Sequence, residues 1–491
     1  MQRRHEEAVR RKRPVVFNND GDDALYFPVD TPVTPGSFLK ARFAPLLGTN
    51  VSTVFYCTTL PFGLFEHRTE IGEVLMRREP WNSPGIPSGT RSAIAELVDQ
   101  RTDPLALAVE FCRANGLEVF SSIRMNDVHD VSYPFKPAYK RRHPDFLFGT
   151  EGAPPPYGYW TGVDYGRAEV REAQLAFITD LCTRYDVDGI ELDFWRHPPH
   201  FRSQAWGKPV TEDETRAMTD LVRRVREMTR AVEERRGRPF LIAARVIESA
   251  EMSRWCGLDL VTWLEQDLID ILVTGEFALA PWKEMVDLGH RYDTPVYPCI
   301  RRAPREDAAR QSIESYRAMA LQAWGEGADG IYFFNLFPEE RIDVFHELGR
   351  PELLAREDRL HHVYGMGQSS FVQYIPEVAR LATMPTLGPM APKDLAPGVS
   401  YRFPLYIGGL PQISGAGISA DFSLQIDAPG LPEGVAVTVN GRHINLARES
   451  QGRLTGPVEA ASLRHGHNQI SVRSGISSRL MDVSISVSNE T

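Results

Sequence analysis

The stretch SSIRMNDVHD, at residues 121–130, combines the side chains that acid–base chemistry on an anionic substrate requires. Arg124 offers a planar cation that binds a carboxylate or a phosphate in a bidentate way. Asp127 and His129 place a carboxylate beside an imidazole, which is a pair that transfers protons near neutral pH. The stretch follows the apolar run LEVF (117–120), so these side chains are expected where a β-strand ends.

Similar apolar, β-branched runs recur over the first two thirds of the chain and alternate with stretches of helical period, such as 104–115 and 170–185. This alternation implies a parallel sheet, and eight units imply an α/β fold of the (β/α)8 TIM barrel type. An open doubly wound sheet is the alternative, but no glycine-rich dinucleotide turn or Walker sequence supports it. The eight predicted strands are residues 14–20, 51–57, 117–127, 187–196, 240–246, 269–277, 295–300 and 328–337.

The pattern changes after the barrel. We predict a catalytic barrel at 1–365, a linker and packing segment at 366–398, and a smaller β-rich, sandwich-like domain at 399–491. The last region contains no tryptophan, whereas sugar-binding modules usually present aromatic platforms. We therefore expect a structural role or a dimer contact for it, with a lectin role as the alternative.

Chemistry in a barrel of this kind lies at the C-terminal ends of the strands. Side-chain alternation predicts that Ser122, Arg124 and Asn126 point into the barrel, as do Glu191 and Asp193. The polar residues at the predicted strand ends are Asn18, Asn19, Asp20, Asp22, Asp23, Arg124, Asp127, His129, Glu191, Asp193, Arg196, Arg245, Glu248, Glu276, Arg301, Arg302 and Asn335.

Four of these strand ends carry arginine, although the net charge of the chain is -10. Several arginines at one barrel mouth indicate an anionic substrate, and Arg124 and Arg196 are the best placed to bind it. The alternative is a purely structural lattice in which Arg124 pairs with Glu191 or Asp193.

Composition excludes several other classes of protein. The negative net charge argues against nucleic-acid and membrane-surface partners, and no apolar run of about 20 residues predicts a membrane span. The charged N-terminus is not a signal peptide, so the expected location is the cytoplasm. The cysteine count of five is odd and includes no CxxC pair, which argues against a disulfide framework or a zinc site.

A catalytic metal is not expected either. Asp127, His129 and Asp130 could form a ligand cluster, but no second histidine motif of metal spacing accompanies them. His197 follows the fourth strand in RHPPH, where the prolines make a joint site with these residues awkward. We therefore predict no metal and no other cofactor.

The string DGIELDFW (188–195) resembles the catalytic strand of family 18 chitinases, but Trp195 stands where their acid would be. The strings NNDG, RMNDVHD and DGIELDFWRHP resemble the barrels grouped as glycoside-hydrolase-like family 10. Within that group, Arg-x-x-Asp-x-His after the third strand, with an arginine after the fourth, resembles glycoside hydrolase family 156. These are inverting exo-sialidases that consist of a barrel and a β-rich domain and form homodimers.

The resemblance implies roles for individual residues. Arg124 and Arg196 would hold the sialic acid carboxylate, and His129 with Asp20 would form the catalytic pair, with Asp22 as the alternative to Asp20. Asp127 and Asn335 would contact the substrate. Independently of the resemblance, Glu191 and Asp193 are further candidates for substrate contact, because they are predicted to point into the barrel. We expect the aspartate to be the base, and we expect His129, beside two acids, to be protonated and to donate a proton.

The predicted activity is therefore inverting hydrolysis of terminal α-linked sialic acid from glycans, by a homodimer. One alternative is a glycosidase acting on another acidic sugar, either a uronide or a sulfated glycan. The other is a barrel that binds carbohydrate without catalysis.

Overall fold

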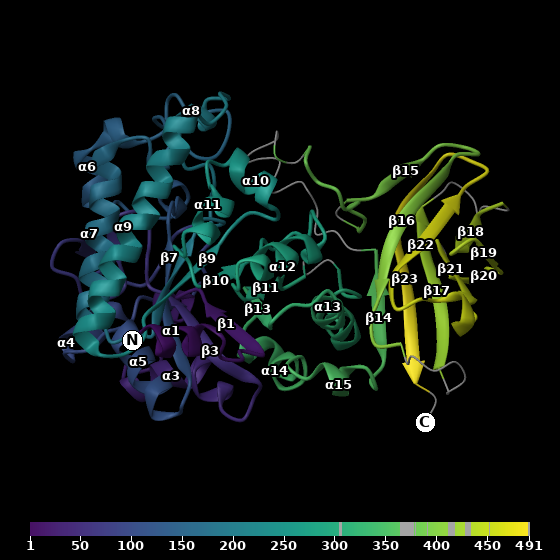
Figure 1. Cartoon of the computed structure of the whole chain (residues 1–491), viewed down its shortest axis with the longest axis horizontal. Coiled ribbons are helices and arrows are strands. Elements are labelled where there is room, and N and C mark those ends of the chain that lie inside the picture. Colours follow the sequence, from purple (N-terminus) through teal and green to yellow (C-terminus); the bar gives the residue numbers. More distant parts are fainter. Residues whose placement is uncertain are drawn as a thin grey trace.

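The computed structural model describes residues 1–303, 307–363, 378, 380–389, 391–410, 418–427, 434–450 and 452–489. The chain forms two bodies, a helix-covered barrel and a body of antiparallel sheets (Figure 1). Within the described residues, no helix is long and apolar enough to cross a membrane.

One parallel sheet forms the barrel wall, in the order β11-β10-β9-β8-β7-β3-β1-β13-β12. Its strands are β1 (Val15–Asn19), β3 (Val51–Cys57), β7 (Glu118–Arg124), β8 (Gly189–Asp193), β9 (Leu241–Arg245), β10 (Ile271–Val273), β11 (Val296–Tyr297), β12 (Cys299–Arg301) and β13 (Ile331–Phe334). All eight predicted strands are present, because β11 and β12 are two halves of the seventh.

The two halves of the seventh strand close the barrel. β11 pairs with β10 and β12 pairs with β13, and only Pro298 separates them. Proline has no N–H to donate, so the ladder is interrupted there. Across this seam the Cys299 amide donates to the Thr274 hydroxyl at 3.4 Å. The sheet therefore closes on itself, and the open doubly wound alternative is wrong.

Helices cover the outside of the wall, and local signals fix their ends. The predicted helices are present as α5 (Pro104–Ala114) and α7 (Ala168–Arg184). α5 begins at Asp103, whose carboxylate accepts the Ala106 amide hydrogen, and Pro104 takes the first helical position. The other helices are α1 (Gln2–Val9), α2 (Asp22–Leu25), α3 (Pro35–Arg42), α4 (Ile94–Asp99), α6 (Ala138–Arg142), α8 (Arg202–Ala205), α9 (Glu212–Arg236), α10 (Ala250–Trp255), α11 (Leu260–Glu265), α12 (Trp282–Arg291), α13 (Ile313–Gly325), α14 (Pro338–Glu347) and α15 (Pro351–Leu354).

Side-chain alternation along the strands separates two cores, as predicted. Ile190, Leu192 and Phe194 of the β8 region pack outward in the core beneath the helices. A second cluster fills the barrel interior and includes Phe120 and Tyr332. The inward positions of β7 and β8 near the C-terminal end are polar, so the interior changes from apolar at its base to charged at its mouth.

Two antiparallel sheets form the C-terminal body and share one apolar core, as a β-sandwich does. One consists of β14 (Arg359–His362), β15 (Lys393–Leu395), β17 (Ile418–Asp427), β20 (Ala447–Ser450), β21 (Arg453–Pro457) and β23 (Ser478–Asn489). The other consists of β16 (Ser400–Ile407), β18 (Ala436–Val439), β19 (Arg442–Ile444) and β22 (Gly466–Arg473).

The strand β14 pairs with β23, so residues before the predicted limit at 365 already take part in a sandwich sheet. The first part of the predicted linker, 366–377, lies outside the described residues. Its later part includes β15, which pairs with β23 as well.

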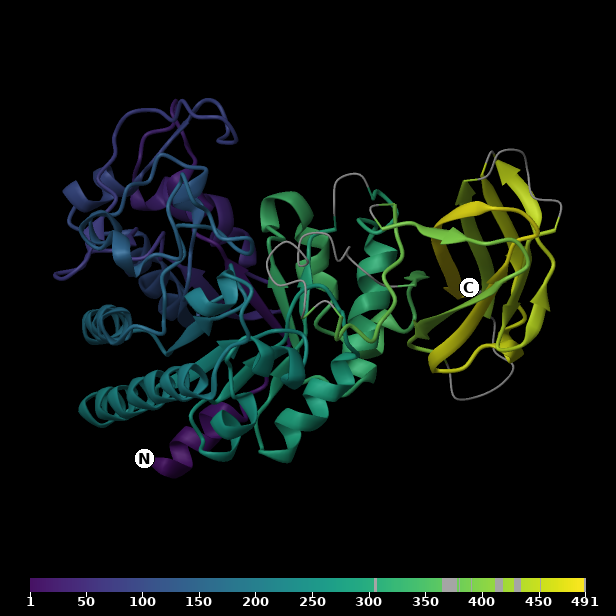
Figure 2. The ribbon, with the colours of Figure 1, turned by 90° about the horizontal axis from the view of Figure 1, so that it is seen from above.

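The sandwich lies against α13, the helix between the seventh and eighth barrel strands (Figure 2). Arg310, just before α13, donates to Asp482 of β23 at 2.8 Å and to Asp307 at 2.7 Å. It also donates to the Leu387 carbonyl at 2.9 Å. Arg310 is 4% exposed, so it joins the two bodies through buried contacts.

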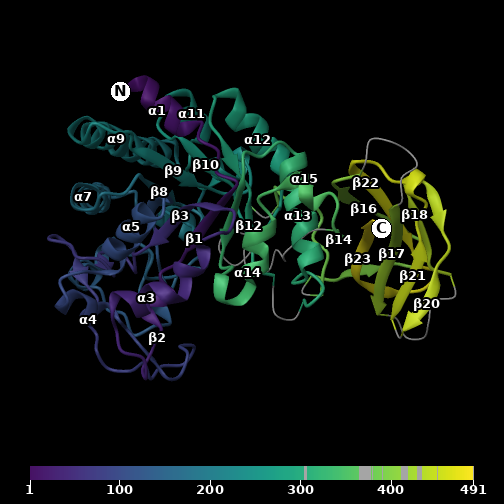
Figure 3. The same ribbon diagram turned by 90° about the horizontal axis from the view of Figure 1, so that it is seen from below.

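The N-terminal helix α1 lies beside α9, the long helix before the fifth barrel strand (Figure 3). His5 on α1 contacts Glu233 at 3.1 Å and Asp270 at 2.9 Å. Burial acts to lower the pKa of His5, but the hydrogen bond and charge of Asp270 and the charge of Glu233 outweigh it and raise the pKa. A protonated His5 therefore attaches α1 to the barrel.

This contact predicts a pH-dependent stability. A raised pKa in the folded state means that the stabilisation is fully present below the ordinary histidine pKa of about 6.5 and is lost as pH rises through the folded value. His5→Gln should lower the free energy of unfolding by about 2 kcal/mol at pH 6 and by clearly less at pH 9. Denaturant unfolding of both proteins across this range measures the difference, and an equal loss at both pH values would contradict the prediction.

Candidate active site

The loop after β1 carries two acids at the barrel mouth. Asp20 Oδ1 accepts hydrogen bonds from Arg42 Nη1 at 2.8 Å and from the Asp22 amide at 3.2 Å. Between them, Gly21 has a φ of 88°, and a Cβ at this position would lie 2.3 Å from the Cys57 carbonyl oxygen. Only glycine fits this turn, and the turn brings the two carboxyl groups together.

The two acids have opposite pKa shifts. Burial acts to raise the pKa of Asp20, but the charges of Arg42 and Arg124 outweigh burial and lower it. Burial raises the pKa of Asp22 to about 8, and the charge of Asp20 adds to this effect. At neutral pH the pair therefore holds one proton, which lies on Asp22.

Arg124, at the end of β7, contacts both the loop after β1 and Asp127. Its Nη1 forms an ion pair with Asp127 Oδ2 at 3.1 Å, and its Nη2 donates to the Asp20 carbonyl at 3.2 Å. The arginine therefore has an acid partner, as the lattice alternative supposed, but the partner is Asp127 and not Glu191 or Asp193.

His129 is held by Asp127 and faces a second arginine. Its Nδ1 lies 2.8 Å from Asp127 Oδ2, and its Nε2 lies 3.3 Å from Arg196 Nη2. Burial lowers the pKa of His129, and the charges of Arg196 and Arg124 add to burial, so they outweigh the raising effect of Asp127.

The expectation of a protonated His129 is therefore wrong for this arrangement. Asp130 does not contribute its charge to the imidazole, because it pairs with Lys140 at 3.1 Å instead. A neutral imidazole whose Nδ1–H is held by a carboxylate presents a lone pair at Nε2. This is the form that accepts a proton.

Arg196 follows β8 and has no acidic partner among the residues that the structure describes. Its backbone amide donates to Asp193 Oδ1 at 3.0 Å, which fixes the chain. Its guanidinium lies 5.6 Å from the Phe334 ring centroid, and its Nε is buried without a hydrogen bond in the described chain. A half-buried guanidinium without a counter-charge is a strong site for an anion.

Glu191 and Asp193 point into the barrel as predicted, but protein groups occupy both. Glu191 Oε2 accepts hydrogen bonds from the Ser122 hydroxyl at 2.5 Å and the Tyr332 hydroxyl at 3.0 Å. Asp193 Oδ2 pairs with Arg245 at 3.4 Å. Burial and then the charge of Asp193 raise the pKa of Glu191 to about 7. Their fully buried positions suit support of the mouth better than contact with a substrate.

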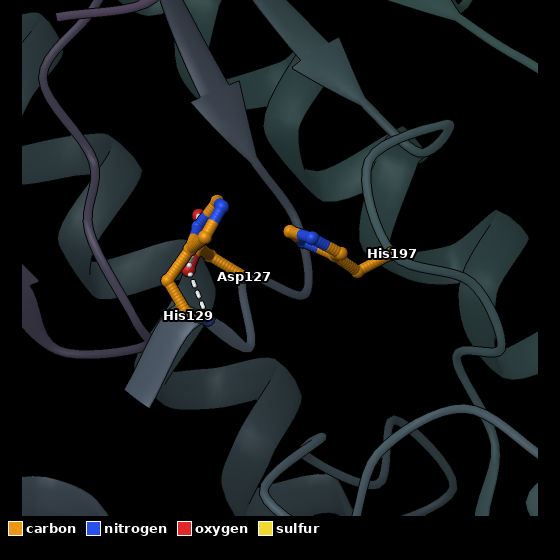
Figure 4. A group of neighbouring side chains, drawn as sticks. All are labelled: Asp127, His129 and His197. Atoms are coloured by element: carbon orange, nitrogen blue, oxygen red, sulfur yellow. Dashed lines mark hydrogen bonds and ion pairs between the residues drawn. The ribbon is translucent and has the colours of Figure 1, made fainter. Parts of the chain in front are cut away.

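His197 lies next to Asp127 and His129, although the prolines of RHPPH were expected to make such a joint site awkward. Ligand atoms of Asp127, His129 and His197 all lie within 4.8 Å of one another. Figure 4 shows the His129 ring beside Asp127 and the His197 ring facing it from the other side. Residues of these types can hold a transition metal. However, Arg124 is paired with Asp127 and Arg196 contacts His129 Nε2, so two guanidinium charges oppose a cation there.

The opposite side of the mouth carries a second charged group. Glu276, after β10, pairs with Arg245 at 2.8 Å and with Arg301 at 2.9 Å. The carboxylate of Glu248 accepts the Phe277 amide hydrogen at 2.7 Å and so holds the loop that carries Glu276. Asn335, after β13, has a positive φ of 51°.

Two contributors were not assigned to the site from the sequence, although His197 directly follows the fourth predicted strand. Arg42 belongs to the helix α3, and its charge is a main cause of the low pKa of Asp20. His197 reaches the cluster through a left-handed backbone, with a φ of 63°. Asn126, predicted to point inward, holds the long loop after β7 by accepting the Val163 amide hydrogen at 2.9 Å.

Comparison by sequence matches no protein family and no curated protein. Comparison by structure finds a family 36 α-galactosidase from Geobacillus stearothermophilus at 12% identity and a TM-score of 0.39; the match covers 95% of this chain and 56% of that enzyme. An α-L-fucosidase from Paenibacillus thiaminolyticus matches at 11% identity over 94% of this chain and 100% of the fucosidase, with a TM-score of 0.44.

A glycoside hydrolase domain from Bordetella bronchiseptica matches at 12% identity over 68% of this chain and 99% of that domain, with a TM-score of 0.42. The match to the α-galactosidase spans little more than half the length of that enzyme. Similarity this distant says nothing about activity, which has to be argued from the site itself.

Proposed function

We propose that the chain is an exo-glycosidase that hydrolyses terminal α-linked sialic acid with inversion at the anomeric carbon. One observation carries this proposal: Arg196, which lacks an acidic partner in the described chain, lies 3.3 Å from the Nε2 of a neutral His129. An anion bound by this arginine would lie beside the group that activates water.

The proximity of anion site and base favours one class of acidic sugar. In a sialoside the carboxylate is attached to the anomeric carbon, so its binding places the reacting carbon next to His129. In a uronide the carboxylate lies on the far side of the ring oxygen, and in a sulfated glycan its position varies. The sialoside therefore matches the short distance between the two groups best.

We assign the catalytic roles in the reverse of the order expected from the sequence. His129 Nε2 takes a proton from water, and the water oxygen forms the new bond to the anomeric carbon. The bond from that carbon to the leaving oxygen breaks, and Asp22 gives its proton to that oxygen. Asp20 stays ionised, and its charge raises the pKa of Asp22 and keeps that proton available.

The separation of the two strands that precede these groups supports inversion. They follow β7 and β1, which are separated by β3, so the strand axes lie about 10 Å apart. Arg124 also stands between Asp20 and Asp127. A separation of roughly 6.5–9.5 Å leaves room for a water molecule, whereas retaining enzymes bring the two groups to about 5 Å.

Arg196 would also couple binding to catalysis. In the free protein its Nη2 contacts the Nε2 lone pair that has to accept the proton. A substrate carboxylate competes for the guanidinium and releases Nε2 for a water molecule. An uncharged sugar would not compete for the guanidinium, so His129 Nε2 would stay in contact with Arg196.

These roles predict a bell-shaped dependence of kcat/KM on pH. Activity should fall at low pH as His129 is protonated, below the ordinary histidine pKa, because its pKa is lowered. It should fall again at high pH as Asp22 loses its proton, near its pKa of about 8. Asp22→Asn should remove the high-pH fall and leave the low-pH fall in place. A high-pH fall that survives in this variant would assign the proton donor to another group.

A proton NMR time course on a simple α-sialoside tests the function directly, because it reports turnover and the anomer released first. We expect the β-anomer of the free sugar to appear first. An aryl uronide and a sulfated aryl glycoside in parallel tubes distinguish the other acidic substrates. Binding of sialic acid without turnover over days would instead indicate a non-catalytic barrel.

A further inference from the structure

The mouth of the barrel is divided into two halves by strand order. The proposed catalytic groups follow β1, β7 and β8, whereas Glu276 follows β10 and Arg301 ends β12 on the other side of the closed sheet. Phe334 joins the halves, because the guanidinium of Arg196 lies 5.6 Å from its ring centroid and that of Arg245 lies 3.9 Å from it. Arg301 is the partner of Phe334 in the ladder between β12 and β13, so Phe334 lies next to both Arg196 and Arg301.

The far half carries hydrogen-bonding groups without protein partners. Arg301 Nη1 pairs with Glu276, but its Nε forms no hydrogen bond among the described residues, and its side chain is 27% exposed. On the adjacent strand end, Asn335 Oδ1 is likewise without a partner in the described chain. A donor and an acceptor, both buried, are thus left without a protein partner in the described chain at two neighbouring strand ends.

The charges of this half are balanced. Arg301 and Arg245 face Glu276, and Arg245 also pairs with Asp193. Two cations and two carboxylates leave no net charge to attract a second anion. Hydroxyl groups, which both donate and accept, fit an open donor beside an open acceptor better than a sulfate or a second carboxylate does.

We infer that Arg301, positioned by Glu276, forms with Asn335 a subsite for the hydroxylated side chain at the end of the sugar distant from its anomeric carbon. The inference rests on the proposed function and adds a specificity-determining residue to it. It implies that the barrel selects its acidic sugar by recognising two groups: a carboxylate, bound by Arg196, and a polyol chain, bound by Arg301.

The test compares two substrates with two enzymes. The substrates are an aryl α-sialoside with its intact side chain and the same compound shortened by mild periodate oxidation and borohydride reduction, which together remove the two terminal carbons and their hydroxyls and leave a primary alcohol. Arg301→Met should lower kcat/KM on the intact compound about 10- to 100-fold. On the shortened compound, the two enzymes should agree within about threefold.

Two further variants serve as controls for this comparison. Arg301→Lys keeps a cation opposite Glu276 but lacks Nε, so it should fold normally and still lose the preference for the intact side chain. Arg302→Met is the matched control, because Arg302 pairs with Glu340 and not with Glu276, so this substitution should leave both rates unchanged. Equal losses on both substrates, or no loss on either, would overturn the inference.

The same experiment separates failure of the inference from failure of the proposed function. Turnover of the intact sialoside by the unmodified enzyme reports the function alone. If neither compound is hydrolysed, binding of free sialic acid and of its shortened analogue, measured by calorimetry, still compares the two side chains. Binding of neither, or equal binding of both, by the unmodified protein would overturn the subsite as well.

Discussion

His129→Gln should reduce kcat for sialoside hydrolysis by about 10²- to 10⁴-fold, with little change in KM. Glutamine can still donate to Asp127, so the loop keeps its shape, but the amide cannot take a proton from water. Under the proposed roles, the substitution removes this proton transfer, while the contact with Asp127, which lies 2.8 Å from His129 in the unmodified protein, can still form. Steady-state kinetics on an aryl sialoside measures the loss.

Added azide distinguishes a missing base from a missing acid. Azide attacks without deprotonation, so it should restore turnover in His129→Gln and form the inverted glycosyl azide. Asp22→Asn should gain nothing from azide, but should be far less impaired with a good leaving group such as 4-nitrophenol than with an alkyl one. If azide instead rescued Asp22→Asn, and His129→Gln were the variant sensitive to the leaving group, the base would lie on the β1 loop and His129 would be the acid.

A matched control is available for this substitution. His290 forms a similar pair with Asp329 at 2.8 Å, far from the mouth and 45% exposed at the side chain. His290→Gln should keep full activity.

Arg196→Met should lower kcat/KM about 10²- to 10³-fold, because it removes the only guanidinium at the site that lacks an acidic partner in the described chain. The loss should come mainly from binding, and Arg196→Lys should recover part of it. A sialoside whose carboxylate is methylated should already be a poor substrate for the unmodified enzyme, and the substitution should not impair it further. An equal loss on the methyl ester would mean that Arg196 acts on the fold and not on the carboxylate.

The same variant should change the pH profile. The charge of Arg196 contributes to the lowered pKa of His129. Without it, the pKa of His129 rises, so the base becomes protonated at a higher pH. The low-pH fall in kcat/KM should therefore move upward in Arg196→Met, which a purely structural role would not cause.

Hydrophobic periodicity predicted the barrel well because it depends on local pattern. Strands buried under helices read as apolar runs, and alternation correctly placed Glu191 inside and Leu192 outside. Strand ends then converge because parallel strands share a direction, and this brought Arg124, His129 and Arg196 into one site.

Other parts of the site depend on contacts that pattern does not encode. The charge state of His129 is set by burial and by arginines from two elements. Its closeness to Asp127 in the sequence therefore predicted the wrong direction for its pKa shift. Arg42 reaches Asp20 from a helix, and His197 reaches the cluster by a left-handed turn. The two acids after β1 could be identified, but their division into an ionised and a protonated partner required their geometry.

The contact between the two bodies has a consequence for how selectivity is built. Arg310 and α13 form the connection between β12, which ends at Arg301, and β13, and the sandwich is attached to this connection. Within the described residues, these contacts come from the β12–β13 connection and not from the loops that carry His129 and Arg196. The C-terminal body therefore supports the half of the mouth in which we propose the sugar-chain subsite, whereas the proposed catalytic groups lie on the other half. Under this proposal, substitutions in the sandwich should change which sugars are accepted more than they change the reaction itself.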